Sequence, residues 1–233
     1  MYFSHLHVHS HYSLLDGLVR PEELLNQAKK FGCDALALTD HGVMHGAIEF
    51  YTKAKEMGIK PIIGCELYVA PNSLYDKMPK IDTRFYHLTA LVKNQTGYKN
   101  LLKLVSIGEL EGFYYKPRVD KETIKKYKAG IIFLSGCTRG EIPQAVLAND
   151  LKKASALSEE YRKIFGSENF YLELQDHPEL PDQEKINKAL LQISQELNIP
   201  IVVTSDIHYL KLEDKKAQDV LLVIQTGTEI ENE

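Results

Sequence analysis

Short apolar runs alternate along this chain with longer segments in which apolar residues recur every three or four positions. Runs rich in Val, Ile, Leu, Phe and Tyr predict strands, because such side chains suit a buried, pleated surface. The expected strands lie near residues 3–9, 34–39, 61–69, 86–92, 130–135, 169–175 and 200–204. The three-to-four spacing is typical of amphipathic helices. The expected helices lie near residues 21–31, 45–57, 97–108, 121–128, 140–148, 150–165, 181–198 and 213–225.

Capping residues stand at the ends of several of these segments. Pro21, followed by two glutamates, suits the first turn of a helix, where a missing N–H is harmless and negative charge faces the positive helix end. Gly32 and Gly58 follow the first two predicted helices, where a helix C-terminus favours glycine. These residues support the predicted helix boundaries.

The order of elements favours an α/β fold. Strands separated mostly by helices predict a parallel sheet, and the apolar runs at 131–135 and 201–205 suggest strands buried on both faces. Most polar residues of chemical interest follow a strand at its C-terminal end, which is the functional rim of β/α barrels. A closed or nearly closed barrel is therefore favoured over an open sheet. Residues 71–84 form the longest irregular segment, and we expect a mobile loop over one rim.

Bulk properties are those of an ordinary globular protein. The chain has 233 residues, of which 44% are hydrophobic and 26% charged, so one large core can form. No apolar run approaches the roughly 18 residues of a membrane span, and no secretory signal is present. Three cysteines do not make a disulfide framework. We therefore expect a cytoplasmic protein without membrane contact, in which Cys33 and Cys65 are small buried hydrophobes.

The net charge limits the kinds of nucleic-acid partner. A formal charge of −4 is unlike that of tight duplex binders, which are usually strongly basic. If nucleic acid is a partner, the site should handle an end or a short single strand.

Histidines, carboxylates and one thiol cluster at the predicted strand ends. In a strand, His5, His7 and His9 point to one face, since side chains alternate with period two. Two neutral imidazoles so spaced can bind one metal ion, although a surface strand can also carry such a pair without function. The residues at other strand ends are Asp16, Asp40, His41, Glu66, His87, Cys137, Asp206 and His208.

Each of these residues also has a purely structural interpretation. Asp40, His41 or Asp206 could cap a helix, His87 could be a hydrogen-bonded core histidine, and Asp16 could make a turn. Together, however, imidazole, carboxylate and thiolate groups at matching strand ends favour a metal site.

Several longer segments carry a family resemblance. They read HLHVHSHYSLLDG, ALTDHG, KPIIGCELYVAP, HLTALVKNQTGYKNL, GFYYKPRVD, IIFLSGC, RGEIP and SDIHYL. This set resembles the PHP (polymerase and histidinol phosphatase) superfamily, and within it the PHP domain of bacterial C-family replicative DNA polymerases. The resemblance implies a distorted (β/α)7 barrel. It also implies that residues 1–233 are a single PHP domain, the N-terminal part of a longer polymerase whose polymerase core is not present.

The resemblance further implies three divalent metal ions and a division of their ligands. His7, His9, Glu66 and Asp206 would hold one ion; Glu66, His87 and Cys137 a second, with Glu66 bridging; Asp16, His41 and His208 the third. Phosphatase relatives have histidines where this chain has Asp16 and Cys137. His5 stands where the superfamily often has Asp, outside the ligand set, and is expected to be structural or to support a ligand. The Cys137 thiolate favours zinc, with manganese or iron at the oxygen-rich positions.

The implied chemistry is phosphoester hydrolysis. A metal-bridging hydroxide, held by Glu66 with His9 and Asp206, would attack phosphorus in line with the leaving oxygen. Arg118 and Arg139 are the predicted phosphate-binding residues, because guanidinium pairs with phosphate bidentately. Arg118 could instead make a surface or interdomain ion pair. Lys116 is a weaker candidate of the same kind. The side chains that could stack on a terminal base, or simply pack in the core, are those of Tyr12, Tyr114 and Tyr115.

Three functions compete at this stage. The first is a 3′–5′ exonuclease acting on a DNA 3′ end or single strand, which would proofread for a parent DNA-directed DNA polymerase in replication. The second is a metal-stabilised structural domain that supports the polymerase core and contacts other replisome subunits. The third is a stand-alone small-molecule phosphatase, which Cys137 and the polymerase-type segments disfavour.

Overall fold

All eight predicted helices are present. The computed structural model describes residues 3–177 and 179–227. The helices are α1 (Pro21–Lys30), α2 (Ala47–Glu56), α3 (Gln95–Leu110), α4 (Lys121–Tyr127), α5 (Glu141–Leu147), α6 (Leu151–Phe165), α7 (Pro181–Leu197) and α8 (Lys215–Thr226), with a short 3₁₀ helix η1 (Leu212–Asp214) leading into α8. Pro21 is the first residue of α1, and Gly32 and Gly58 take the left-handed conformation just after α1 and α2, as predicted. In the described residues, no helix is long and apolar enough to cross a membrane.

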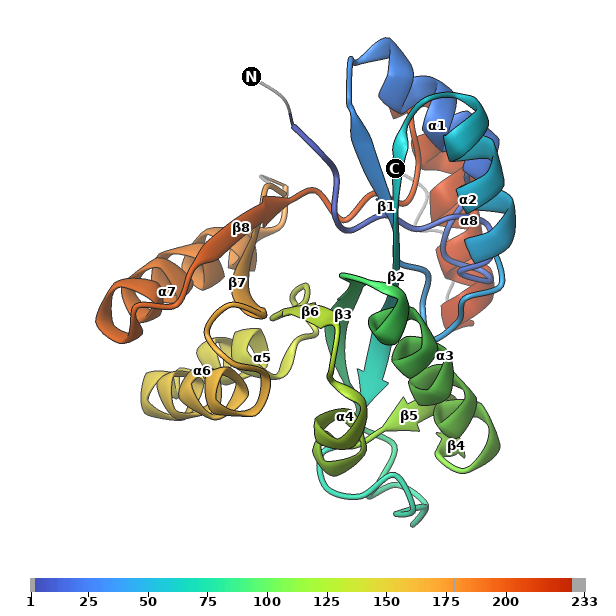
Figure 1. Ribbon diagram of the computed structural model, residues 1–233. Coiled ribbons are helices and arrows are strands. Elements are labelled where there is room, and N and C mark those ends of the chain that lie inside the picture. Colours follow the sequence, from blue (N-terminus) through green and yellow to red (C-terminus); the bar gives the residue numbers. More distant parts are fainter. Residues whose placement is uncertain (1–2, 178, 228–233) are drawn as a thin grey trace.

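Six of the seven predicted strands are present, and a short hairpin was not predicted. The strands are β1 (Ala35–Leu38), β2 (Lys60–Val69), β3 (Tyr86–Val92), β4 (Phe113–Tyr114), β5 (Lys116–Val119), β6 (Ile131–Leu134), β7 (Phe170–Gln175) and β8 (Ile201–Thr204). They form one curled sheet in the order β4-β5-β2-β3-β6-β7-β8, with β1 also paired to β2. Figure 1 shows β1, α1, α2 and α8 on one side and β7, β8 and α5–α7 on the other, with β2 and β3 between them.

The predicted strand at 3–9 is wrong as a regular strand, and its backbone hydrogen bonds explain why. Ala37 N donates to His5 O and Thr39 N donates to Val8 O. Between these two bonds the N-terminal segment advances by three residues while the β1 side advances by two. This extra residue breaks the ladder in the manner of a β-bulge. On its other side the segment pairs only at Val8 with Ile207. It nevertheless lies between β1 and the chain after β8, so it bridges these two parts of the curled, half-barrel sheet.

The sheet is mixed, which corrects the predicted parallel sheet. Strand β3 runs antiparallel to both β2 and β6, whereas the pairs β1–β2, β2–β5, β6–β7 and β7–β8 are parallel. The reason is the connection 71–84, which has no helix to carry the chain to the opposite rim. Its consequence is useful for the site: the N-terminal end of β3, with His87, lies at the same rim as the C-terminal ends of β2 and β6.

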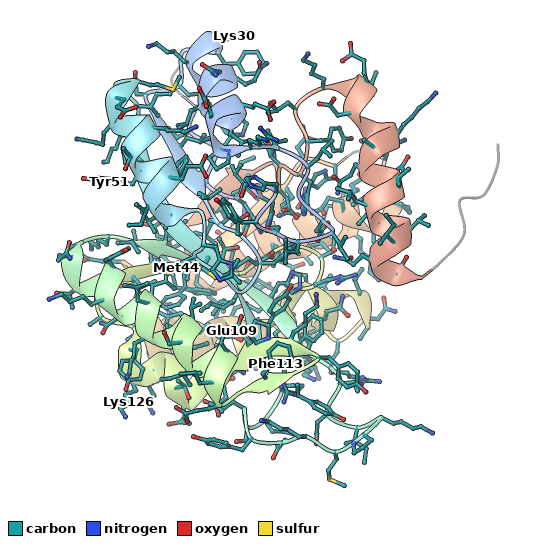
Figure 2. The ribbon with its side chains drawn as sticks, turned by 90° about the vertical axis from the view of Figure 1, so that its right-hand side faces the viewer. Lys30, Met44, Tyr51, Glu109, Phe113 and Lys126 are labelled. Carbon is teal, nitrogen blue, oxygen red and sulfur yellow. The ribbon has the colours of Figure 1, made fainter. Side chains whose placement is uncertain are left out.

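The core packs between the sheet and the helices. Its largest cluster centres on Leu67, Phe133 and Phe170, and a second cluster joins Val8 and Phe50 beneath α1 and α2. Figure 2 shows Met44, which precedes α2, where α2 and α3 meet. Cys33 and Cys65 are buried free thiols, as predicted.

Candidate metal centre

The nine predicted ligand residues meet in one buried pocket at the rim. The elements that bring them there are the bulged N-terminal segment with the loop after it, β2, β3, and the loops after β1, β6 and β8. Val8 packs into the core while His7 and His9 on either side face the pocket, so the predicted alternation holds despite the bulge. The nine residues are His7, His9, Asp16, His41, Glu66, His87, Cys137, Asp206 and His208.

Glu66, near the end of β2, is the centre of the pocket. Its carboxylate is buried and is reached by four imidazoles and a thiol. Its oxygens lie 2.7 Å from His41 Nδ1, 2.9 Å from His87 Nδ1, 3.3 Å from His7 Nε2, 3.5 Å from His9 Nε2 and 3.5 Å from Cys137 Sγ. One carboxylate therefore touches members of every predicted ligand group.

Asp206 faces the two histidines of the first segment. Its Oδ1 lies 3.3 Å from His7 Nε2 and 3.3 Å from His9 Nε2. Asp206 has a φ of 43°, in the left-handed region that a non-glycine residue seldom adopts. Such strained backbone is held by its surroundings and is typical of functional sites.

His87 and Cys137 form a second group beside Glu66 Oε1. Cys137 Sγ lies 3.4 Å from His87 Nδ1. Burial, with the nearby carboxylate of Glu66, raises the pKa of the Cys137 thiol well above its usual value. A cation would therefore be needed to favour the thiolate here.

Asp16, His41 and His208 form a third, less buried group. Asp16 lies 2.9 Å from His41 Nε2 and 3.6 Å from His208 Nε2. The His208 ring stacks on that of His9, with centroids 4.4 Å apart. Burial would lower the pKa of His41, but the carboxylates of Glu66 and Asp16 outweigh it and raise that pKa to about 9. Burial and the charges of His41 and His208 lower the pKa of His9 to about 3.

Several polar atoms of this pocket make no regular hydrogen bond, although some of them lie in the close imidazole–carboxylate pairs described above. Six atoms of the nine residues are buried and unpartnered: His7 Nε2, His9 Nε2, His41 Nδ1, His87 Nε2, Glu66 Oε2 and Asp206 Oδ1. Buried polar atoms without partners are costly and rare in proteins. Among the nine residues, three sets have ligand atoms close enough together to share an ion: His9, His41 and His208; His7, His9 and Glu66; and His41, Glu66 and His87. These donors fit a group of divalent cations.

Glu173 on β7 supports this pocket and was missed in the sequence. Its buried carboxylate accepts hydrogen bonds from Thr204 Oγ1 at 2.6 Å, Gly136 N at 3.1 Å and Thr89 Oγ1 at 3.2 Å. It also lies 2.6 Å from His7 Nδ1. Gln175 Nε2 at 3.2 Å is a fourth donor, and because a carboxylate only accepts hydrogen bonds, His7 Nδ1 must donate to it. In the neutral ring, the Nδ1–H therefore points at Glu173 and the Nε2 lone pair points into the pocket. The signal in the sequence is a glutamate inside the apolar run of β7.

Asp40 holds His9 in a similar way, through Ser13. Ser13 Oγ donates to Asp40 Oδ1 at 2.7 Å, so its lone pairs are left to accept from His41 N at 3.1 Å and His9 Nδ1 at 2.9 Å. The Nε2 lone pair of His9 therefore also faces the pocket. The sequence placed Asp40 near the site but gave no role to Ser13.

The position of Arg118 contradicts its predicted role in phosphate binding. The side chain is fully buried, and its Nε, Nη1 and Nη2 donate to the backbone carbonyls of Gly112, Asp82 and Asp76 at 3.3, 2.7 and 2.7 Å. The alternative of a surface ion pair is wrong as well. Arg118 anchors the irregular segment 71–84, which is further held by Leu74, buried and bonded through its N–H to Asp120.

The other predicted substrate contacts lie around the pocket to different extents. Arg139 is exposed at the rim, and its charge is among the causes, after burial, that lower the pKa of His87. Lys116 lies 5.5 Å from the ring centroid of Tyr68, which packs against His87. Three tyrosines differ from one another: Tyr12 bonds Glu49, Tyr114 packs under Arg118, and Tyr115 is 67% exposed. His5 packs against Phe3 at the edge of the fold.

Known proteins resemble this chain over nearly its whole length. The chain is 48% identical over 227 residues to the DNA polymerase III alpha subunit of Treponema pallidum, covering 97% of this chain and 19% of that protein. The identity is 47% over 232 residues with the subunit of Borreliella burgdorferi (99% and 20%) and 45% over 234 residues with that of Thermus aquaticus (99% and 19%). The chain thus spans about a fifth of the length of these relatives.

Two solved structures share the fold. A candidate metal-dependent phosphoesterase from Bifidobacterium adolescentis matches with a TM-score of 0.56 at 15% identity, covering 88% of this chain and 87% of that one. An amidohydrolase from Chromobacterium violaceum matches with a TM-score of 0.54 at 14% identity, covering 94% and 96%.

The family assignment follows from a direct match. A family model for the PHP domain matches residues 5–177, which include seven of the nine pocket residues, from His7 to Cys137. This range is well over half of the chain. The chain is therefore a member of the PHP domain family.

Proposed function

We propose that the pocket binds three divalent cations. His7, His9, Glu66 and Asp206 would hold the first; Glu66, His87 and Cys137 the second; Asp16, His41 and His208 the third. The unpartnered buried atoms of six of these residues support this assignment. The Cys137 sulfur favours zinc at the second position, while manganese or iron suits the oxygen-rich positions.

Glu66 carries the proposal. A single buried carboxylate whose two oxygens contact three different ligand groups can bridge cations, which no isolated imidazole can do. Its pKa is lowered well below the usual range: burial would raise it, but the charges of His87, His7 and His41 dominate. Glu66 therefore stays ionised in the pocket.

The proposed reaction is hydrolysis of a phosphodiester at a DNA 3′ end, a 3′–5′ exonuclease. When bound, divalent cations supply a water of lowered pKa and stabilise charge on phosphoryl oxygens. The chain's own residues position the reaction: Glu66, His9 and Asp206 surround the place where the attacking water would sit. Arg139, exposed at the rim, would pair with a phosphate.

The biological setting is inferred from the relatives. Because the similar proteins are DNA polymerase III alpha subunits, we take residues 1–233 as one PHP domain of such a polymerase, acting in DNA replication in the cytoplasm beside the polymerase core and other replisome subunits. The exonuclease would then remove misincorporated nucleotides. The competing proposal, a metal-stabilised domain without hydrolysis, makes the opposite prediction in the test below.

The test is a primer-degradation assay. The purified chain is loaded with zinc or manganese and incubated with a 5′-labelled single-stranded primer. We expect a ladder shortened from the 3′ end, lost in His9→Ala. His45→Ala is the matched control, since His45 is an exposed histidine four residues from His41 and outside the nine. A fully metallated protein that leaves the primer intact would refute the exonuclease and favour the structural role.

A further inference from the structure

A separate cavity opens beside the metal centre. Its volume is about 680 Å³, and it lies between the segment leading into β3, the length of α5 and the start of α6. The lining residues that matter here are Arg84, Phe85, Tyr86, Arg139 and Lys153. A cavity of this size is in the range of small-ligand sites and is too small for a duplex.

The cavity shares a wall with the pocket of nine residues. The Phe85 ring stacks on the ring of His87, with centroids 5.9 Å apart and an interplanar angle of 8°. Arg139 follows Cys137 by two residues, and its backbone carbonyl accepts a hydrogen bond from His87 N at 3.1 Å. A chain lying in this cavity could therefore reach the centre without crossing the body of the protein.

The cavity has three cationic side chains against two acidic ones. Arg84, Arg139 and Lys153 are exposed, and their side chains make no ion pair with any residue that the structure describes. The two acidic lining residues are already engaged. Glu141 pairs with Lys121 at 2.9 Å and accepts from Tyr161 at 2.7 Å, and Asp150 caps α6 by accepting from Lys153 N at 2.9 Å. On a chain of net charge −4, three free cations in one cavity are a local exception.

Aromatic rings complete the lining. Phe85 and Tyr86 are half-buried and adjacent in the chain, next to Arg84. Cations interleaved with aromatic rings are the features by which proteins bind single-stranded nucleic acid, since phosphates meet the cations and bases stack on the rings. An acidic peptide would use the cations but leave the rings without a role.

We propose that this cavity binds the nucleotides that precede the scissile linkage of a single-stranded DNA 3′ end. Arg84, Arg139 and Lys153 contact successive phosphates, and Phe85 and Tyr86 contact the bases. The terminal linkage then lies in the metal centre. This inference rests on the proposed function, because it assumes that the centre acts on DNA.

The test measures binding and needs no hydrolysis. The protein is titrated into a fluorescently labelled oligothymidylate of eight nucleotides, and the anisotropy is recorded at several salt concentrations. A chelator is present so that no hydrolysis occurs. Three phosphate contacts predict a slope of log affinity against log salt of about −2, since each contact to a single strand contributes roughly 0.7. Arg84→Gln and Lys153→Gln should each reduce the slope by about 0.7. Lys152→Gln is the matched control, because Lys152 is the exposed neighbour of Lys153 on α6 and lies outside the lining.

Each result decides the inference. Equal slopes for the parent protein, Arg84→Gln and Lys153→Gln would overturn it, as would equally tight binding of a poly-glutamate peptide of matched charge. Reduced slopes in both variants would sustain it even if the primer assay showed no cleavage, in which case only the exonuclease would fail. Primer cleavage together with unchanged slopes would support the exonuclease and overturn the proposed role of the cavity.

Discussion

Replacing Glu173 by Gln tests how the fold directs a ligand toward the proposed centre. The Glu173 carboxylate is surrounded by donors: His7 Nδ1, Thr204 Oγ1, Gln175 Nε2, Gly136 N and Thr89 Oγ1. A glutamine keeps the shape but has only one acceptor end. Whichever way its amide turns, an NH₂ group faces either the Gly136 N–H or the side of His7. The His7 ring then loses its charged acceptor and its fixed tautomer.

The structure sets the size of the effect. A carboxylate that orients a ligating histidine typically contributes 10–100-fold to metal affinity, or about 1.4–2.7 kcal/mol. Mismatched donors at one buried site cost about 1–3 kcal/mol, which corresponds to a fall in Tm of roughly 2–12 °C for a domain of this size. Glu173→Gln should therefore show both weaker metal binding and a lower Tm. The loss of metal affinity should remain when it is measured at a temperature at which the variant is fully folded.

The assay is a zinc competition titration against a chelating dye, with thermal unfolding in parallel. Glu168→Gln is the control, since Glu168 is an exposed glutamate just before β7. We expect zinc affinity at the tightest site to fall at least tenfold in Glu173→Gln and to stay unchanged in the control. A Glu173→Gln variant that binds zinc as tightly as the parent would refute the reasoning.

Three further outcomes are expected. In the metal-free protein, the His41 pKa of about 9 lies above the ordinary 6.5, so His41 contributes about 3 kcal/mol that is fully present below pH 6.5 and is lost as the pH rises to 9. Tm measured in a chelator should therefore fall across this window, less so in His41→Gln; a parallel decline in both proteins would contradict this. Arg118→Gln should lower stability by about 3 kcal/mol and expose 71–84 to limited proteolysis, because three carbonyls lose a charged donor; unchanged Tm with weaker DNA binding would restore the phosphate role. Cys137→Ser should reduce bound zinc from three ions to two, measured by elemental analysis, since the thiolate favours zinc; an unchanged count would exclude Cys137 as a ligand.

The sequence predicted the elements better than their connections. Helices were found because their apolar periodicity and caps are local, and Gly32 and Gly58 have the conformations that their positions suggested. The direction of β3 was not predictable from local pattern, because the hydrophobic pattern of a strand does not show whether it runs parallel or antiparallel to its neighbours. The segment at 3–9 has strand composition, yet one extra residue against β1 breaks its ladder.

The pocket residues were predictable as a group, and their supporting residues were not. His7 and His9 alternate with core residues, and that alternation survived the bulge. Glu173 and Ser13 act only through hydrogen bonds to His7 and His9 that form in the folded protein, so the local sequence around them does not predict these bonds. Arg118 shows the converse error: an arginine beside a rim looked available for phosphate, but the loop 71–84 supplies three carbonyls that occupy it.

The most direct test of the central claim is to locate metal in the pocket. Crystals of the zinc-loaded protein, measured at the zinc absorption edge, should give three anomalous peaks around Glu66. One should lie about 2.3 Å from Cys137 Sγ and the others about 2.0–2.1 Å from histidine nitrogens. A fully loaded protein whose zinc lies only outside these nine side chains would contradict the account.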